Sequence, residues 1–123
     1  MKFDERSRSV IRCAIEVHRN LGAGLLESTY RQCLAYELSR AAISFQMEVA
    51  LPVRRKDVLL DFGYRMDLLV HGDPIVEIKS VEALLPIHQA QILTYLRLAN
   101  VPPGLLIDFN VTRLQTGIRR FVL

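Results

Sequence analysis

The stretch that decides the fold reads Gly63-Tyr64-Arg65-Met66-Asp67-Leu68-Leu69-Val70-His71-Gly72-Asp73-Pro74-Ile75-Val76-Glu77-Ile78-Lys79-Ser80-Val81. Two runs rich in apolar and β-branched residues flank the turn residues at 71–74, a pattern that predicts a β-hairpin. Asp67, Glu77 and Lys79 interrupt these runs. Charged side chains on covered strands are costly unless they are paired or bind an ion. These three residues therefore need a structural or a chemical explanation.

A metal-dependent site is one explanation. Glu77 and Lys79 are two residues apart in a strand and should project from the same face. The hairpin brings Asp67 close to Glu77, and two converging carboxylates suit a hard divalent cation such as magnesium. Lys79 can then orient a water and offset the charge that develops on a phosphate. The alternative is a structural ion pair, because Glu-x-Lys is a frequent pattern.

The register of this hairpin decides between the two explanations. With a two-residue Gly72-Asp73 turn, Leu68 rather than Asp67 would lie opposite Glu77, and Asp67 would point to the wrong face. A three-residue loop, or a bulge near Asp67, would correct this. We therefore predict an odd-length loop around Gly72-Asp73 or a bulge between Tyr64 and Leu69.

Apolar periodicity outside the hairpin predicts three helices and further strands. The first helix is capped by Asp4 or Ser7 and stopped by Gly22, the second follows Gly24, and the third runs from Pro86 to about Ala99. Strands are expected at residues 43–53, 58–70, 75–81, 105–111 and 118–123. The order ααβββαββ predicts an α/β fold with a mixed β-sheet flanked by helices, in a single domain over residues 1–123.

Three polar residues on the predicted helices are further candidates. Glu27 lies on the apolar stripe of the second helix and should face the sheet. Alternatively, with Gly24 as N-cap, Glu27 would occupy the third helical position and stabilise the helix start. Gln91 and Tyr95 are four residues apart and share a face of the third helix. They can contact a metal-bound water, a phosphate or a base, or they can be a polar edge of the core.

The composition favours a globular protein with an anionic partner. The 123 residues are 50% apolar and 24% charged, with a net charge of +3, and arginine, which suits forked phosphate contacts, supplies most of the positive charge. Two cysteines without ligand spacing exclude a disulfide framework and give no zinc spacing. No apolar run is of membrane-spanning length and no signal peptide is evident, so we expect a soluble, cytoplasmic protein. The mean hydropathy of +0.19 is compatible with a homodimer.

Five ordered blocks of the chain resemble the GxxExxY proteins, a small branch of the PD-(D/E)XK nuclease superfamily. The blocks cover nearly the whole chain: Gly24-Leu25-Leu26-Glu27-Ser28-Thr29-Tyr30, Gly63-Tyr64-Arg65-Met66-Asp67-Leu68-Leu69-Val70, Val76-Glu77-Ile78-Lys79-Ser80-Val81, His88-Gln89-Ala90-Gln91-Ile92-Leu93-Thr94-Tyr95-Leu96 and Leu106-Ile107-Asp108-Phe109-Asn110-Val111.

The resemblance implies a restriction-endonuclease-like core and a set of roles. Asp67, Glu77 and the carbonyl of Ile78 would hold Mg²⁺ or Mn²⁺, Lys79 would be the catalytic lysine, and Glu27 would match a helical acid that some branches add to the metal site. Gln91 and Tyr95 resemble the motif of the RecB-type exonuclease branch. The chain departs from the usual pattern at three positions without losing a ligand: Ala23 replaces proline, Gln89 an acid and Asp108 an asparagine.

These features predict a metal-dependent nuclease that hydrolyses phosphodiester bonds of nucleic acid, and we expect DNA. One alternative is a catalytically inactive module that binds nucleic acid or protein. Another is an interaction protein whose first two helices dimerise and whose polar cluster is structural. A module that had lost activity should lack the lysine or an acid, and every element is present here.

Overall fold

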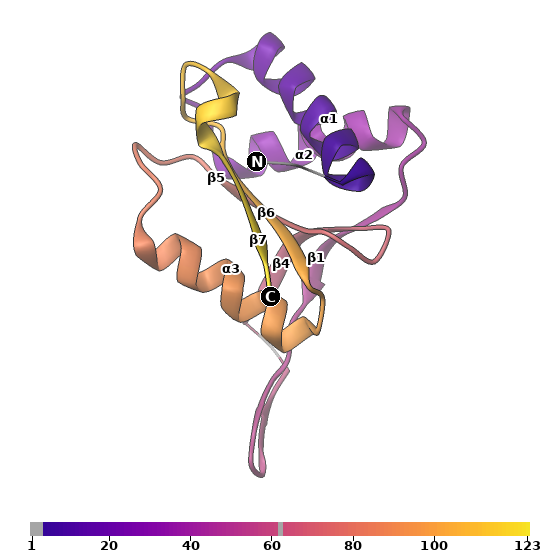
Figure 1. Ribbon diagram of the computed structural model, residues 1–123, viewed down its shortest axis with the longest axis vertical. Coiled ribbons are helices and arrows are strands. Elements are labelled where there is room, and N and C mark those ends of the chain that lie inside the picture. Colours follow the sequence, from indigo (N-terminus) through magenta and orange to yellow (C-terminus); the bar gives the residue numbers. More distant parts are fainter. Residues whose placement is uncertain (1–3, 62) are drawn as a thin grey trace.

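The computed structural model describes residues 4–61 and 63–123. It contains a five-stranded mixed sheet in the order β1-β4-β5-β6-β7, in which only the β5–β6 pair is parallel. Helix α3 connects the parallel pair (Figure 1). The predicted α/β class with a mixed sheet is confirmed. The elements are α1 (Glu5–Leu21), α2 (Glu27–Arg40), β1 (Phe45–Ala50), β2 (Val53–Arg55), β3 (Val58–Leu60), β4 (Arg65–Val70), β5 (Ile75–Lys79), α3 (Pro86–Ala99), β6 (Pro103–Asp108), η1 (Leu114–Gly117) and β7 (Ile118–Val122).

The first two helices cover one face of the sheet (Figure 1). Helix α1 begins where the Asp4 carboxylate accepts a hydrogen bond from the backbone N–H of Ser7 at 2.8 Å, and it ends at Gly22, which has a φ of +70°. The apolar stripes of both helices pack on the sheet. The core on this face includes Val10, Ala14, Tyr30, Leu34, Leu38, Leu68, Val70, Val76, Ile78, Leu105, Ile107 and Phe109.

The position at which α2 begins excludes one of the two predicted roles of Glu27, the capping role. The helix begins at Glu27 itself, and its N-cap is Leu26, whose side chain caps nothing. Gly24 therefore lies outside the helix, and the capping role at the third helical position is wrong for Glu27. Tyr30 contributes to this geometry, because its hydroxyl donates to the Gly22 carbonyl at 2.6 Å and closes the glycine turn.

Helix α3 covers the opposite face of the sheet. A second core forms there from Leu51, Met66, Ile75, Tyr95 and Leu96. The helix begins at Pro86, as predicted, and ends at Asn100 in the left-handed conformation. None of the helices in the described part of the chain is long and apolar enough to cross a membrane.

Two of the predicted strands are divided. The run 43–53 contains β1 and β2, and the run 58–70 contains β3 and β4, with only β1 and β4 in the main sheet. Strands β2 and β3 form a separate two-stranded hairpin around Lys56-Asp57. Apolar composition alone cannot distinguish a strand of the sheet from a strand that extends beyond it. The expected strand at 105–111 is also shifted, since β6 ends at Asp108 and the turn η1 precedes β7.

Candidate active site

The hairpin between β4 and β5 has the register that the site requires. Leu68 pairs with Val76 and Leu69 pairs with Ile75, a register that places Asp67 opposite Glu77 when it is continued by one residue beyond the last ladder pair. Three residues, 71–73, separate Val70 from Pro74, and the N–H of Val70 donates to the Pro74 carbonyl at 3.1 Å. The predicted odd-length loop is therefore confirmed.

The backbone of the neighbouring strand β1 is also irregular next to Asp67. Glu48 has a φ of +48°, a left-handed conformation that is uncommon in a strand. Met47 packs in the core under α1 and α2, whereas Val49 packs in the core under α3. Residues two apart on a regular strand share a face, so the side-chain alternation is broken at Glu48. Backbone irregularities of this kind cluster at functional sites.

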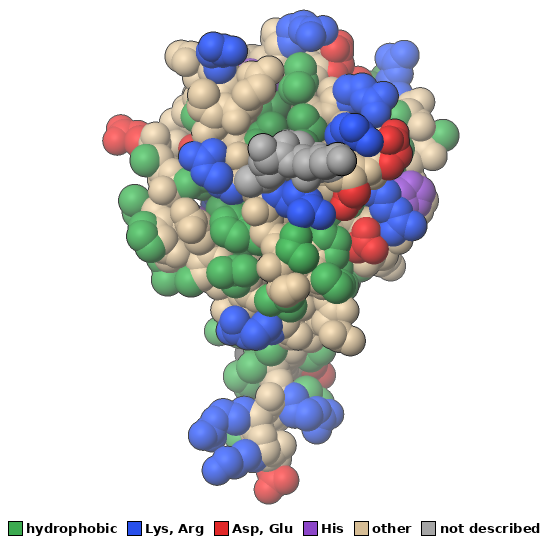
Figure 2. Space-filling model, in the orientation of Figure 1, with side chains coloured by type: hydrophobic (Ala, Val, Ile, Leu, Met, Phe, Trp, Pro, Cys, Tyr) green, Lys and Arg blue, Asp and Glu red, His purple; other side chains and the backbone are tan. Residues whose placement is uncertain are grey.

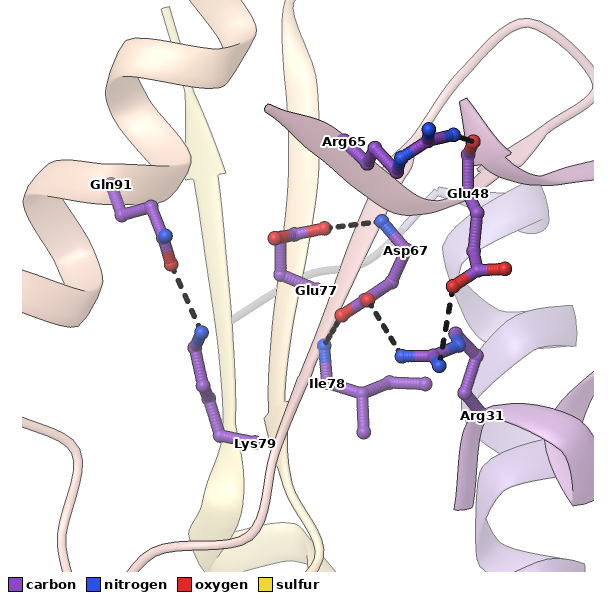
Figure 3. Close-up of polar contacts among 8 residues, drawn as sticks. All are labelled: Arg31, Glu48, Arg65, Asp67, Glu77, Ile78, Lys79 and Gln91. Carbon is purple, nitrogen blue, oxygen red and sulfur yellow. Dashed lines mark hydrogen bonds and ion pairs between the residues drawn. The ribbon is translucent and has the colours of Figure 1, made fainter. Parts of the chain in front are cut away.

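Asp67 and Glu77 interact with each other's strands through their carboxylates (Figure 3). The N–H of Asp67 donates to Glu77 Oε2 at 2.7 Å, and the N–H of Ile78 donates to Asp67 Oδ2 at 2.8 Å. The two side chains thus occupy the space where the β4–β5 backbone ladder would otherwise continue. They are held between the strands, with their acidic groups next to each other.

Glu77 carries the largest electrostatic perturbation at this site. Burial raises its pKa to about 8, and the neighbouring Asp67 charge adds to this effect. The hydrogen bond from the Asp67 N–H and the positive charge of Lys79 oppose the rise in pKa, and Glu27 adds a smaller increase. Glu77 is only 4% exposed. Burial and the Asp67 charge therefore outweigh the nearby positive charge of Lys79 in setting the pKa of Glu77.

Lys79 lies at the end of β5 and is held by α3. Its Nζ donates to Gln91 Oε1 at 3.0 Å (Figure 3). The Gln91 amide in turn donates to the Tyr95 hydroxyl at 3.4 Å. Burial raises the pKa of Tyr95, followed by the charge of Glu77. Lys79, Gln91 and Tyr95 therefore form one hydrogen-bonded chain beside the carboxylates.

Arg31 is a site residue that the sequence reasoning missed. It projects from α2 and places Nη1 3.2 Å from Asp67 Oδ1 and Nη2 3.4 Å from the Glu48 carboxylate (Figure 3). The side chains of Arg31 and Asp67 are 17% and 19% exposed. One signal was present in the sequence, because Arg31 lies four residues after Glu27 and so shares its helix face.

Glu27 is close enough to Glu77 for its negative charge to raise the Glu77 pKa slightly. No hydrogen bond between the two side chains is present among the described residues. Within residues 4–61 and 63–123, no three His, Cys, Asp or Glu side chains come together as a ready metal site. The prediction that Glu27 joins Asp67 and Glu77 around one cation therefore stays a prediction.

The donor set nevertheless suits a hard cation. Two adjacent carboxylates, Asp67 and Glu77, and the carbonyl of Ile78 offer only oxygen ligands, which magnesium and manganese prefer. Burial is the main cause of the raised pKa of Glu77, and the adjacent Asp67 charge adds to it. A divalent cation at this position would favour the ionised form of Glu77.

A family model described as the PD-(D/E)XK nuclease superfamily matches residues 4–121. The match spans nearly the whole chain, and the chain therefore belongs to this superfamily, as the sequence predicted. The mixed sheet flanked by helices agrees with the nuclease core. No curated protein and no solved structure gave a significant match.

Proposed function

We propose that the protein is a metal-dependent nuclease of the GxxExxY branch that hydrolyses phosphodiester bonds of DNA. The observation that carries the proposal is the placement of Lys79 beside the Asp67–Glu77 carboxylate pair. Two adjacent carboxylates that offer oxygen ligands to a divalent cation, next to a lysine held in place by Gln91, form the arrangement that phosphodiester hydrolysis needs.

Each residue would have a distinct role in that reaction. Asp67, Glu77 and the Ile78 carbonyl would hold the cation, and Glu27 is a further candidate ligand. The bound cation would polarise a phosphoryl oxygen and lower the pKa of a water. Lys79 would donate hydrogen bonds to the attacking water or to the phosphate as charge develops.

The helix α3 would position this lysine. Gln91 holds the Lys79 ammonium at 3.0 Å, so the side chain loses less conformational freedom when substrate binds. Tyr95 in turn contacts the Gln91 amide, which orients its oxygen toward the lysine. Gln91 is thus a positioning residue for Lys79, and Tyr95 supports Gln91.

One observation favours the inactive binding module. Arg31 already pairs with Asp67, and an acid that is neutralised by an arginine can be purely structural. In that case the polar cluster would stabilise the sheet and would bind no cation. Lys79 would then serve only to offset the negative charge of the nearby acids.

Cleavage assays separate the two functions. Labelled single- and double-stranded DNA and RNA are incubated with the protein in magnesium, in manganese and in a chelator. We expect DNA cleavage only with metal, and its loss in Lys79→Ala but not in Arg19→Ala, an exposed cation of α1 that serves as control. Metal-independent cleavage, or equal cleavage by Lys79→Ala, would contradict the proposed function.

A further inference from the structure

The β2–β3 hairpin projects from the rest of the molecule (Figure 1). Val53 pairs with Leu60, Arg54 with Leu59 and Arg55 with Val58, so that Lys56 and Asp57 form a two-residue turn at the tip. Every residue from Arg54 to Leu60 is exposed. We call residues Val53–Leu60 the arm.

The arm exposes a run of apolar side chains to solvent. Val58, Leu59 and Leu60 are 57%, 48% and 39% exposed. An isolated two-stranded hairpin is at best marginally stable in water. The arm therefore has the character of a surface that is completed by a binding partner.

The charges of the arm indicate what that partner is. Arg54, Arg55 and Lys56 are three consecutive cations, and no carboxylate in the described parts of the chain forms a salt bridge with any of them. The only acid of the arm is Asp57, at the turn. Figure 2 shows Lys and Arg side chains on both sides of the end of the projection. Because neighbouring strand residues point to opposite faces, Arg54 and Arg55 extend in opposite directions.

The arm is also continuous with the candidate active site. Ala50 of β1 pairs with Arg65 of β4, and the N–H of Leu51 donates to the Tyr64 carbonyl at 2.9 Å. Asp67 lies two residues after Arg65 on the same strand. Asp57 at the tip precedes Asp67 by ten residues, so at about 3.3 Å per strand residue the tip lies up to roughly 33 Å from Asp67. That span corresponds to roughly ten base pairs of duplex DNA.

We propose that the arm lies in the major groove of duplex DNA whose phosphodiester backbone occupies the candidate active site. This proposal rests on the proposed nuclease function. It specifies that the substrate is duplex DNA and that the arm is the surface that binds it. A two-stranded β-ribbon fits the major groove, where cations on its two faces reach phosphates on opposite walls. The exposed apolar residues can contact thymine methyl groups. A second copy of the arm fits poorly, because the cationic tips would repel each other.

Binding measurements test the proposal without cleavage. All proteins carry Lys79→Ala, and the affinity for a duplex of about 20 base pairs is measured between about 50 and 200 mM salt. The arm variant is Arg54→Gln/Arg55→Gln/Lys56→Gln. The control is Arg8→Gln/Arg12→Gln/Arg19→Gln, which removes the same charge from exposed arginines of α1.

We expect the arm variant to bind at least about tenfold more weakly and its salt dependence to fall by about 0.9 per lost phosphate contact, while the control changes little. An unchanged salt dependence in the arm variant, or a parent protein that does not bind duplex DNA, would overturn the proposal. A change of oligomeric mass in the arm variant by sedimentation would assign the arm to self-association instead. If the arm effect is present but wild-type protein does not cleave DNA with metal, the proposed nuclease fails and the arm proposal stands.

Discussion

The carboxylates of Asp67 and Glu77 each accept a hydrogen bond from a backbone N–H of the other's strand. The N–H of Asp67 donates to the Glu77 carboxylate, and the Asp67 carboxylate accepts from the N–H that follows Glu77 in the chain. Each acid therefore helps to hold the backbone that positions the other. These backbone hydrogen bonds keep the two acidic side chains adjacent, with the Arg31 guanidinium on the Asp67 side of the pair.

The first prediction concerns metal binding. Asp67→Asn keeps the shape of the side chain and removes its charge, so we expect the heat of magnesium and manganese binding in calorimetry to disappear. Glu16→Gln, on the exposed side of α1, is the control and should bind metal as the wild type does. Binding that persists unchanged in Asp67→Asn would place the metal elsewhere.

The second prediction separates a catalytic from a structural Lys79. Lys79→Ala should lower kcat by about 10²–10³-fold while metal and DNA binding persist, because its interaction strengthens as charge develops in the reaction. Gln91→Ala should have the same effect to a smaller degree, about tenfold, since Lys79 loses only its positioning partner. If both variants keep full kcat and mainly lower the melting temperature, the polar chain is structural.

The third prediction is a pH dependence of stability in the metal-free protein. The pKa of Glu77 is raised from 4.5 to about 8, so between these values the folded protein keeps a proton that the unfolded chain has released. Stability must then fall as pH rises through this window, by an amount on the order of a few kcal/mol. Urea unfolding in a chelator between pH 5 and 8 measures the slope.

Glu77→Gln is the control for that slope. An amide has no proton to lose, so the decline between pH 5 and 8 should vanish in this variant. Added magnesium should also flatten the decline in the wild type, because the cation stabilises the ionised acid. A wild-type protein that becomes more stable as pH rises through this window would contradict the raised pKa.

The fourth prediction assigns opposite effects to Arg31 and Glu48. Arg31 occupies Asp67 Oδ1 and so competes with a cation, which means that Arg31→Gln should tighten magnesium binding by roughly three- to tenfold. Glu48→Gln removes the acid that shares Arg31, strengthens the hold of Arg31 on Asp67, and should weaken magnesium binding. Calorimetry on both variants measures whether the magnesium affinity rises in Arg31→Gln and falls in Glu48→Gln.

The same Arg31→Gln protein should be less stable without metal by about 1–3 kcal/mol, since it leaves the acids without their guanidinium partner. Weaker rather than tighter magnesium binding in Arg31→Gln would show that Arg31 organises the site instead of competing for it.

The sequence by itself determined the helices, the α/β class and the identity of the acid pair with its lysine. These features depend on local periodicity and on the cost of placing charge in an apolar strand. An odd-length loop around Gly72-Asp73 was also predicted as one of two alternatives, because either an odd-length loop or a bulge near Asp67 can set Asp67 opposite Glu77. All of these arguments use residues that are close in the chain or joined by one turn.

The tertiary structure alone decided which groups surround that pair. Arg31 reaches Asp67 because α2 packs on the sheet against β1 and β5, the two neighbours of β4. The left-handed backbone at Glu48 places Met47 and Val49 of β1 in different cores. The division of two apolar runs into sheet and arm was also not predicted, since apolar residues typical of strands occur on both sides of each division. The partners of Asp67 and the path of the arm depend on contacts between segments that are distant in the sequence. These contacts form only when the helices pack on the sheet, so no local sequence pattern predicts them.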